Sequence, residues 1–430
     1  MEQTCEQLGL LKNEGGVVRV PFLIKGRLVV PPEIPRDRIE AAFSYVAKDV
    51  LYCSLPDAQL IREPVIDRGS MRYTGEYVYQ VLPQVRPVGL IETDIDGLAH
   101  GLYALPVEDI LDYLGLLSAA LADNQRLVSR VREICRLTSE LPDALLDGWF
   151  DTFPVVFNRE AARAMIDNEL SLWGIQGSRL LNGWVEAPSM PVPGVVSSLA
   201  GGIRRDGTPP ERAATLIRAM PTRQLHIAAG NAPEIPVICA LRAILTKSAA
   251  VVKCPHGTTL GGALLSLAAA VAAPDHPITR SLSLVYWQGG DETIESALFL
   301  PNAFDRIIVW GSSETVASVQ SRTPFTRVIS FNPRYSVSLI GRESFGDDLE
   351  DVAARACMDS LIHNQKACTS SLVHYVEGSE EQANLYGETV QRALAKWDVL
   401  MPQFVAPAAR GQIKRMKRGK YAGARWYLNG

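Results

Sequence analysis

The sequence predicts an α/β protein whose core is a doubly wound parallel sheet with helices on both faces. Strand-like and helix-like segments alternate after Arg218, which is the pattern of consecutive β-α-β units. The strand-like segments are short apolar runs, as expected for parallel strands that are buried on both faces. The chain has 430 residues, 47% hydrophobic and 21% charged, so it is long enough for two or three domains with a large core.

The first half of the chain gives fewer regular signals. Residues 16–30 are rich in β-branched side chains around a proline and a glycine, which predicts a hairpin. Leucines at spacings of three and four predict helical structure over residues 107–141. A helix is also predicted over 158–172 with Asn158 as its N-cap, and the Pro- and Gly-rich stretch 186–210 is predicted to be a connection.

The alternation in the second half is regular. The predicted strands are 224–229, 249–253, 282–287, 306–310, 328–331, 336–340 and 372–376. The predicted helices are 236–245, 259–273, 291–300, 313–320 and 349–362. Ligands bind at the carboxyl ends of the strands in such sheets, so the turns at Gly230, Lys253 and Gly311 are the first candidates for a site.

Composition excludes several classes of function. The net charge of −4 provides no basic field for nucleic acid. The longest mostly apolar run, Leu260 to Ala273, is too short for a membrane span, and Met1 to Leu10 lacks the features of a signal segment. The seven cysteines are scattered and form no CxxC pair, so neither a metal site nor a disulfide framework is predicted. We therefore expect a cytoplasmic protein with reduced thiols.

The sharpest chemical signal is Cys368, within the segment His363–Ser371 (HNQKACTSS), where a predicted helix gives way to a strand. A thiol in a polar turn can face a cleft, which suits a nucleophile. The alternative is a buried structural cysteine. His363 and His374 flank the segment and are candidates for favouring the thiolate, although histidines beside such a loop are more often structural.

Two turns after strands add weaker signals. In Gly230-Asn231, glycine permits close approach of a ligand and the asparagine carboxamide can donate to a developing oxyanion. In Gly311-Ser312, the start of the following helix can hold a phosphate group. Each turn could equally be a simple connection, and a full GxGxxG motif is not present.

The order and spacing of these segments resemble the aldehyde dehydrogenase superfamily. Gly230-Asn231 stands where that superfamily has a "WN" pair, and Pro255 follows Asn231 by 24 residues with Lys253 beside it. Trp310–Glu314 stands at the "TGS" turn, and Asn364–Cys368 at the loop of the catalytic cysteine.

Within that superfamily the chain most resembles the LuxC-type fatty acyl-CoA reductases of bacterial bioluminescence and related pathways. The segments that carry this resemblance are VPFLIKG (20–26), HIAAGNAP (226–233) and NQKACTSS (364–371). It covers most of residues 20–390 and is most specific over 220–380. It implies that residues 1–220 frame a nucleotide-binding domain whose core is 221–330, and that 331–430 form the catalytic domain.

The resemblance implies reduction of a fatty acyl thioester to an aldehyde. Cys368 would attack the thioester and form an S-acyl enzyme, which a nicotinamide cofactor would reduce. Asn231 and the cysteine backbone N–H would hold the oxyanion. Lys253, Pro255, Gly311 and Ser312 would bind the cofactor.

One difference between this sequence and the oxidative members of the superfamily favours reduction over oxidation. Oxidative members of the superfamily carry a glutamate base in a strand that matches Val328–Arg334 here, and Ser330 falls at its position. Without a base, hydrolysis of the acyl-enzyme is slow. Two alternatives remain open, namely an oxidative aldehyde dehydrogenase and a non-catalytic subunit that binds acyl chains or a partner enzyme.

The cofactor expected from the turn after Lys253 is NADPH. NAD-dependent members often place a glutamate in this turn, whereas here it reads Lys253-Cys254-Pro255-His256-Gly257 without an acid. No carboxylate of the turn would repel a 2′-phosphate, and Lys253 could attract one. The alternative is that Lys253 is a solvated strand end.

Only 62 residues follow Cys368, fewer than is usual in the superfamily, so we expect a truncated or shortened catalytic domain. The expected partners are an acyl-CoA or acyl-carrier substrate, an acyl-protein synthetase or thioesterase, and a second copy of the chain. The segment from Arg410 to Arg425 holds seven basic residues and no acid. It would be either a solvated loop or a contact for a CoA or carrier phosphate.

Overall fold

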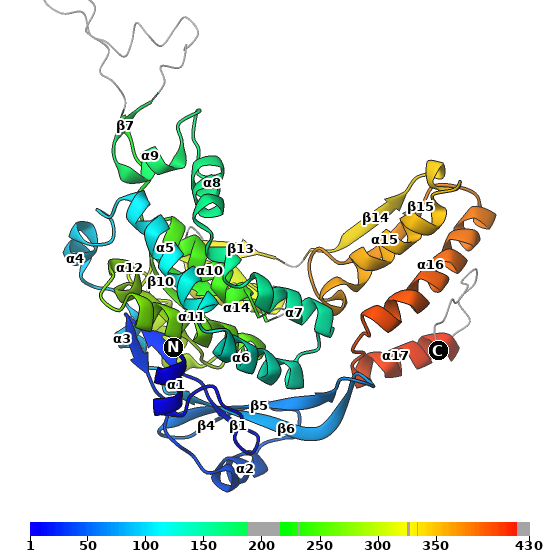
Figure 1. Ribbon diagram of the computed structural model, residues 1–430, viewed down its shortest axis with the longest axis horizontal. Helices are drawn as coiled ribbons and strands as arrows, with labels where there is room; N and C mark the ends of the chain where they lie inside the picture. Colours follow the sequence, from blue (N-terminus) through cyan, green and yellow to red (C-terminus); the bar gives the residue numbers. More distant parts are fainter. Residues whose placement is uncertain (188–215, 231–232, 325–326, 333, 419–430) are drawn as a thin grey trace, which may run out of the picture.

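The computed structural model of the protein describes residues 1–187, 216–230, 233–324, 327–332 and 334–418 (Figure 1). Its centre is a seven-stranded sheet in the order β13-β12-β9-β10-β11-β2-β3. The strands are β2 (Phe22–Ile24), β3 (Arg27–Val29), β9 (Arg223–Ile227), β10 (Ala249–Lys253), β11 (Leu282–Val285), β12 (Arg306–Trp310) and β13 (Val328–Phe331). The five strands from β9 to β13 run parallel, and β2 and β3 extend the sheet in antiparallel fashion.

Helices connect the parallel strands as the sequence predicts. They are α10 (Ile235–Leu245), α11 (Thr259–Ala272), α12 (Pro277–Arg280), α13 (Glu292–Leu298) and α14 (Ser313–Arg322), with the 3-10 helix η2 (His256–Thr258) before α11. The chain runs from β9 through β10 to β11 and then crosses back to β12 and β13. Right-handed crossovers in opposite directions place α10 and α11 on one face and α13 and α14 on the other, which is the predicted doubly wound arrangement.

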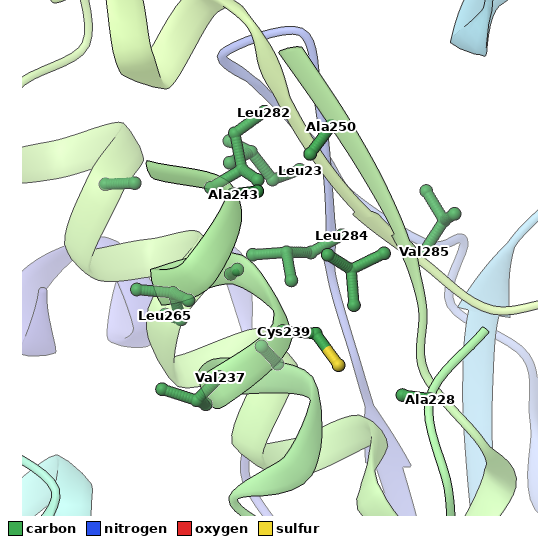
Figure 2. Close-up of a cluster of buried hydrophobic side chains, with 14 of the residues drawn as sticks. Leu23, Ala228, Val237, Cys239, Ala243, Ala250, Leu265, Leu282, Leu284 and Val285 are labelled. Atoms are coloured by element: carbon green, nitrogen blue, oxygen red, sulfur yellow. The ribbon is translucent and has the colours of Figure 1, made fainter. Parts of the chain in front are cut away.

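The core lies between the sheet and α10 and α11. Figure 2 shows side chains from these helices, such as Cys239, Ala243 and Leu265, in one buried cluster with Leu282 and Leu284 of β11. Small residues on α10 and α11 let the helices approach the strands closely. This packing fixes the strand ends that carry the candidate site.

A second sheet, in the order β1-β6-β5-β4, lies beside the first. Its strands are β1 (Val17–Arg19), β4 (Tyr52–Ser54), β5 (Ala58–Asp67) and β6 (Arg72–Pro83), and its helices are α1 (Glu2–Leu8) and α2 (Arg36–Ser44). The predicted hairpin over 16–30 is therefore only partly right. Residues 22–29 form it, whereas β1 pairs with β6 because Val18 is fully buried there.

A layer of helices covers α11 and the second sheet, with α5 packed on α11 and α6 on β5 (Figure 1). It comprises α5 (Val107–Ala122), α6 (Gln125–Thr138), α7 (Asp143–Thr152), η1 (Val155–Phe157), α8 (Arg159–Glu169) and α9 (Gly177–Asn182). Two short helices precede this layer, α3 (Pro87–Leu90) and α4 (Ile95–His100), and α3 packs on α13. The helical stretch 107–141 is two helices, since Asn124 leaves helical geometry and its side chain binds the Ala120 carbonyl and the Glu2 N–H. The predicted N-cap is confirmed, because the Asn158 side chain accepts a hydrogen bond from the Ala161 N–H.

The C-terminal part stands apart from the central sheet in Figure 1. Its two parallel strands are β14 (Ser336–Ile340) and β15 (Ser371–Val376), and its helices are η4 (Arg342–Ser344), α15 (Leu349–Leu361), η5 (Ile362–Gln365), α16 (Glu380–Leu400) and α17 (Pro407–Arg418). The tip of the β5-β6 hairpin reaches this part, where Ile66 and Met71 pack on Phe404. The basic segment after Arg410 is thus helical as far as residue 418.

Some predictions fall on residues outside the described ranges. Most of the connection predicted over 186–210 lies there, between the short paired strands β7 (Val185–Glu186) and β8 (Leu216–Ile217). The same holds for the basic residues beyond 418. Among the helices described, none is both long and apolar enough to cross a bilayer.

Candidate active site

The predicted turns meet at one edge of the central sheet. Strands β10 and β12 flank β9, and the chain order reverses between β9 and β12. The carboxyl ends of such strands form a crevice at this switch point, where doubly wound proteins bind dinucleotides. Gly230 follows β9, Pro255 follows β10, and Gly311 and Ser312 follow β12, whereas Asn231 lies outside the described residues.

The first two turns approach each other closely at glycine residues. A Cβ atom at Gly230 would lie 3.2 Å from the Pro255 side chain, and one at Gly257 would lie 3.7 Å from the Gly230 carbonyl. At the third turn, Ser312 caps α14 by accepting a hydrogen bond from the Thr315 N–H (3.3 Å). These bare backbone segments at a helix start are the kind of surface on which a pyrophosphate binds.

Lys253 ends β10 between aromatic rings. Its Nζ lies 5.5 Å from the ring centroid of Trp287 and 5.8 Å from that of Tyr286. Burial lowers the pKa of Lys253, while the nearby Glu295 acts in the opposite sense. Glu295 lies outside the turn that follows β10, and Arg322 donates a hydrogen bond to its carboxylate (2.7 Å). The negative charge of Glu295 is therefore balanced by Arg322.

The segment before Cys368 has an unusual backbone. His363, Asn364 and Gln365 have φ values of 52°, 53° and 62°, in the left-handed region that side chains other than glycine rarely adopt. The buried Asn364 side chain donates to the Phe404 carbonyl (2.9 Å), which holds this bend against the connection after α16. Consecutive strained residues of this kind cluster at functional sites.

Cys368 is exposed in the turn that follows. The Ser336 hydroxyl donates a hydrogen bond to the Cys368 carbonyl (2.6 Å), so the first residue of β14 fixes the backbone of the predicted nucleophile. The prediction that Cys368 lies in an exposed polar turn is confirmed. Cys239, Cys254 and Cys357 are buried, as expected for structural cysteines.

The two histidines have different surroundings. The His374 ring is hydrogen-bonded to the hydroxyls of Ser360 (2.9 Å) and Tyr386 (2.7 Å), which is a structural arrangement. The His363 Nδ1 has no hydrogen-bond partner among the described groups. Burial lowers the pKa of both rings.

A cavity of about 330 Å³ joins the strand ends to the cysteine loop. Gly230 and His256–Thr258 line it from the edge of the central sheet, and His363, Asn364 and Lys366 line it from the loop. Its remaining walls come from β5, β6 and the region where α6 meets α7, together with Leu51, Pro233 and Leu260. Cys368 is not among the lining residues described, but the segment leading into it is.

Sequence reasoning missed the cavity walls that come from the N-terminal half. Glu63 of β5 and Gln80 of β6 are buried there, and Thr138 and Glu140 follow from the end of α6. Glu63 carries no distinct local signal, because the same strand also contains Gln59, Arg62 and Asp67. Its place on the cavity wall depends on the pairing of β5 with β6 and on the packing of α6 against β5.

The strand expected at the position of the oxidative base is β13. Its four residues include no acid, and Ser330 pairs with Val309 of β12. Trp310 and Phe331, at the carboxyl ends of β12 and β13, stack at a centroid distance of 3.7 Å and an interplanar angle of 4°. This edge of the sheet therefore presents aromatic rings in place of a carboxylate.

The doubly wound sheet and the adjoining cysteine loop define a fold of the aldehyde dehydrogenase type. Solved structures with this fold include aldehyde dehydrogenase 21 from Physcomitrella patens, with a TM-score of 0.57 and 12% identity, covering 88% of this chain and 64% of that one. Another is an oxidoreductase from Marinobacter aquaeolei, with a TM-score of 0.53 and 14% identity, covering 78% of this chain and 61% of that one. The predicted fold class is confirmed.

The sequence comparisons narrow this class. Residues 210–419 match the family model described as acyl-CoA reductase (LuxC), which confirms the resemblance for this segment. A long-chain acyl-protein thioester reductase from Photorhabdus laumondii is 31% identical over 194 residues, covering 42% of this chain and 39% of the relative. Its counterpart from Vibrio harveyi is 28% identical over 193 residues, covering 42% of this chain and 40% of the relative. The chain thus spans about two fifths of the length of the curated relatives that it matches.

Proposed function

We propose that this protein reduces a fatty acyl thioester to an aldehyde through an S-acyl intermediate on Cys368. The observation that carries the proposal is the single cavity lined both by the switch-point edge of the sheet and by the loop that leads into Cys368. An enzyme that transfers an acyl group to a thiol and then reduces it needs the nucleophile and the cofactor site to open into the same cavity.

In this proposal Cys368 is the nucleophile and Asn231 is the oxyanion donor. The Cys368 thiolate attacks the thioester carbonyl, and the donor thiol leaves. The carboxamide of Asn231 and the backbone N–H of Cys368 stabilise the charge on oxygen. The Ser336 hydrogen bond to the Cys368 carbonyl holds the same backbone in place.

The cofactor in this proposal is NADPH, which supplies hydride to the acyl group when it is bound. Lys253 and Pro255 would hold its adenosine end, and Gly311 and Ser312 would hold its phosphates at the start of α14. The close backbone approach at Gly230 and Gly257 leaves room that a Cβ atom would fill. An NADP-dependent glyceraldehyde-3-phosphate dehydrogenase from Bacillus halodurans shares the fold at a TM-score of 0.56 and 14% identity, covering 88% of this chain and 65% of that one.

The absence of an acid on β13 favours reduction over the oxidative alternative. A base beside the acyl-enzyme would direct water at it, whereas Ser330 cannot act in this way at neutral pH. The acyl group then persists on Cys368 until it is reduced. We therefore classify the activity as that of an acylating oxidoreductase acting on an oxo group.

The relatives' names, long-chain acyl-protein thioester reductases, suggest the acyl donor. We propose a long-chain acyl group carried by CoA, a carrier or an acyl-protein synthetase, with a synthetase or thioesterase as partner enzyme. The enzyme would work in the cytoplasm, where its thiols stay reduced. A second copy of the chain remains a proposed partner.

The test is NADPH oxidation, followed by absorbance, with a panel of acyl-CoAs. We expect turnover in the wild type and in the control Cys53→Ala, and none in Cys368→Ala. Mass spectrometry should show an acyl mass on Cys368 before NADPH is added. If the wild type shows neither turnover nor acylation, the enzymatic proposal is wrong and the non-catalytic binding subunit is favoured.

A further inference from the structure

We propose that Glu63 is the general acid that protonates the departing thiol when Cys368 takes the acyl group. This inference rests on the proposed function and adds the proton donor for its first step. Glu63 belongs to β5 in the N-terminal sheet, yet its side chain lines the same cavity as His363, Asn364 and Lys366 of the cysteine loop.

The Glu63 carboxyl group has one oxygen bound and one free. It is 7% exposed, and its Oε2 accepts a hydrogen bond from the Thr138 hydroxyl (2.9 Å). The Gln80 amide also lies close enough to interact with it. Its Oε1 is buried and has no hydrogen-bond partner among the described groups. A buried polar atom left unpaired on a cavity wall costs stability, so it calls for a functional explanation.

The protonation state of Glu63 suits a general acid. Burial raises the pKa of Glu63 to about 7, although the Thr138 hydrogen bond and the nearby Gln80 amide act to lower it. The group therefore holds a proton near neutral pH and can still release it. A general acid works best when its pKa lies near the working pH.

The rings around the cavity are less suited to this role. Burial lowers the pKa of His256 and His363, so these imidazoles are neutral near pH 7. Burial raises the pKa of Tyr73, which lines the cavity, to about 12, and it also raises that of Tyr286, which lies near Glu63 but is not among the lining residues described. These phenols hold their protons too firmly to serve as acids.

The remaining titratable groups of the cavity are also occupied or inert. Burial and the nearby Glu63 raise the pKa of Cys135, which keeps this thiol protonated. Glu140 forms an ion pair with Lys366. Among the lining residues described, Glu63 is therefore the group that combines a free oxygen with a releasable proton.

The proposed step conserves atoms and charge. A bond forms between the Cys368 sulfur and the acyl carbon, and the bond from that carbon to the donor sulfur breaks. The proton of the Glu63 carboxyl group moves to the departing sulfur, which leaves as a neutral thiol. Glu63 is left as a carboxylate and regains its proton from water.

The test compares two acyl donors in the absence of NADPH. One is an acyl-CoA, whose alkyl thiol needs a proton to leave. The other is an aryl thioester of the same acyl chain, whose low-pKa thiol leaves readily as the anion. We expect Glu63→Gln to slow thiol release from acyl-CoA by about a hundredfold and from the aryl thioester by less than about twofold. Glu76→Gln, an exposed change on the neighbouring strand, is the control and should affect neither donor.

The pH profile supplies a second readout that a structural role would not change. The ratio of the wild-type rate with acyl-CoA to that with the aryl thioester should fall above about pH 7, as Glu63 loses its proton, because ionisation of Cys368 affects both donors alike. Thr138→Val removes the hydrogen bond that lowers the Glu63 pKa, so this fall should move to higher pH. This variant keeps the proposal testable even if Glu63→Gln does not fold.

Three outcomes would overturn the proposal. Equal slowing on both donors would show that Glu63 only supports the structure. Unchanged release from acyl-CoA in Glu63→Gln, or an unshifted profile in Thr138→Val, would show that another group donates the proton. If wild type gains no acyl mass at Cys368 from either donor, the proposed function itself fails, and the role of Glu63 fails with it.

Discussion

Ser336 donates a hydrogen bond from its hydroxyl to the backbone carbonyl of Cys368 (2.6 Å). This contact joins the start of β14 to the turn of the predicted nucleophile, 32 residues further along the chain. It restricts the peptide that follows Cys368 and thereby the direction of its thiol. The backbone around a nucleophile must be held within small limits for the attack geometry to be kept.

The first prediction concerns this hydrogen bond. Ser336→Ala should slow acylation of Cys368 about fivefold, since a net hydrogen bond contributes about 1 kcal/mol. The rate can be measured as thiol release from acyl-CoA without NADPH. Ser321→Ala, which removes a similar hydroxyl contact to the Ser318 carbonyl far from the loop, is the control. Equal rates in wild type and Ser336→Ala would show that the turn is held by other contacts.

The second prediction concerns the bend at Asn364. Asn364→Ala loses the hydrogen bond to the Phe404 carbonyl and places alanine at a φ of 53°. Each effect costs roughly 1 kcal/mol, so the free energy of unfolding of the variant should be roughly 2 kcal/mol lower than that of wild type. Asn364→Gly keeps the backbone conformation and should lose about half as much. Chemical denaturation and limited proteolysis of the loop should rank wild type above Asn364→Gly and Asn364→Gly above Asn364→Ala. The prediction is wrong if the two variants behave alike.

The third prediction concerns cofactor choice. If Lys253 attracts a 2′-phosphate, Lys253→Met should raise the KM for NADPH about tenfold, equivalent to about 1.4 kcal/mol. The KM for NADH should change by less than about twofold, because NADH lacks that phosphate. Lys48→Ala, a change on an exposed loop, is the matched control. A parallel rise in both constants would mean that Lys253 supports the strand end by packing on Trp287 and Tyr286.

Local pattern was sufficient to predict the central strands. The bounds predicted for β10, β12, β13 and β14 are those observed, because each is a short run of apolar or β-branched residues between turn signals. The three turns that follow β9, β10 and β12 also share one edge, as parallel strands require. The exposed position of Cys368 followed from its polar neighbours.

Contacts between distant segments could not be predicted from the sequence. β1 pairs with β6 about 60 residues later, and nothing in residues 16–30 distinguishes this from a simple hairpin. The stacking of Trp310 on Phe331 depends on the register of β12 and β13. Glu63 lines the same cavity as the cysteine loop only because the β5-β6 hairpin, the end of α6 and that loop come together in the folded protein. Local periodicity carries no information on such pairings.

The fourth prediction concerns stability as a function of pH. Burial raises the pKa of Glu63 from 4.5 to about 7 and that of Glu234 from 4.5 to about 8. The folded state thus keeps protons that the unfolded state has released, so stability falls as the pH rises from about 4.5 through these values. For Glu63, this difference in pKa between the folded and unfolded states corresponds to a loss of roughly 3 kcal/mol of stability across that pH range.

Glutamine at position 63 is neutral at every pH and should remove this contribution. Glu63→Gln should therefore lose less stability than wild type between pH 5 and pH 8.5, and Glu63→Gln with Glu234→Gln should lose less still. Denaturant midpoints at several pH values measure how steeply the stability of each variant changes with pH. An exposed change such as Glu76→Gln should leave the slope as in wild type. A Glu63→Gln slope identical to that of wild type would mean that Glu63 is ionised in the folded protein, and would remove its capacity to act as an acid at neutral pH.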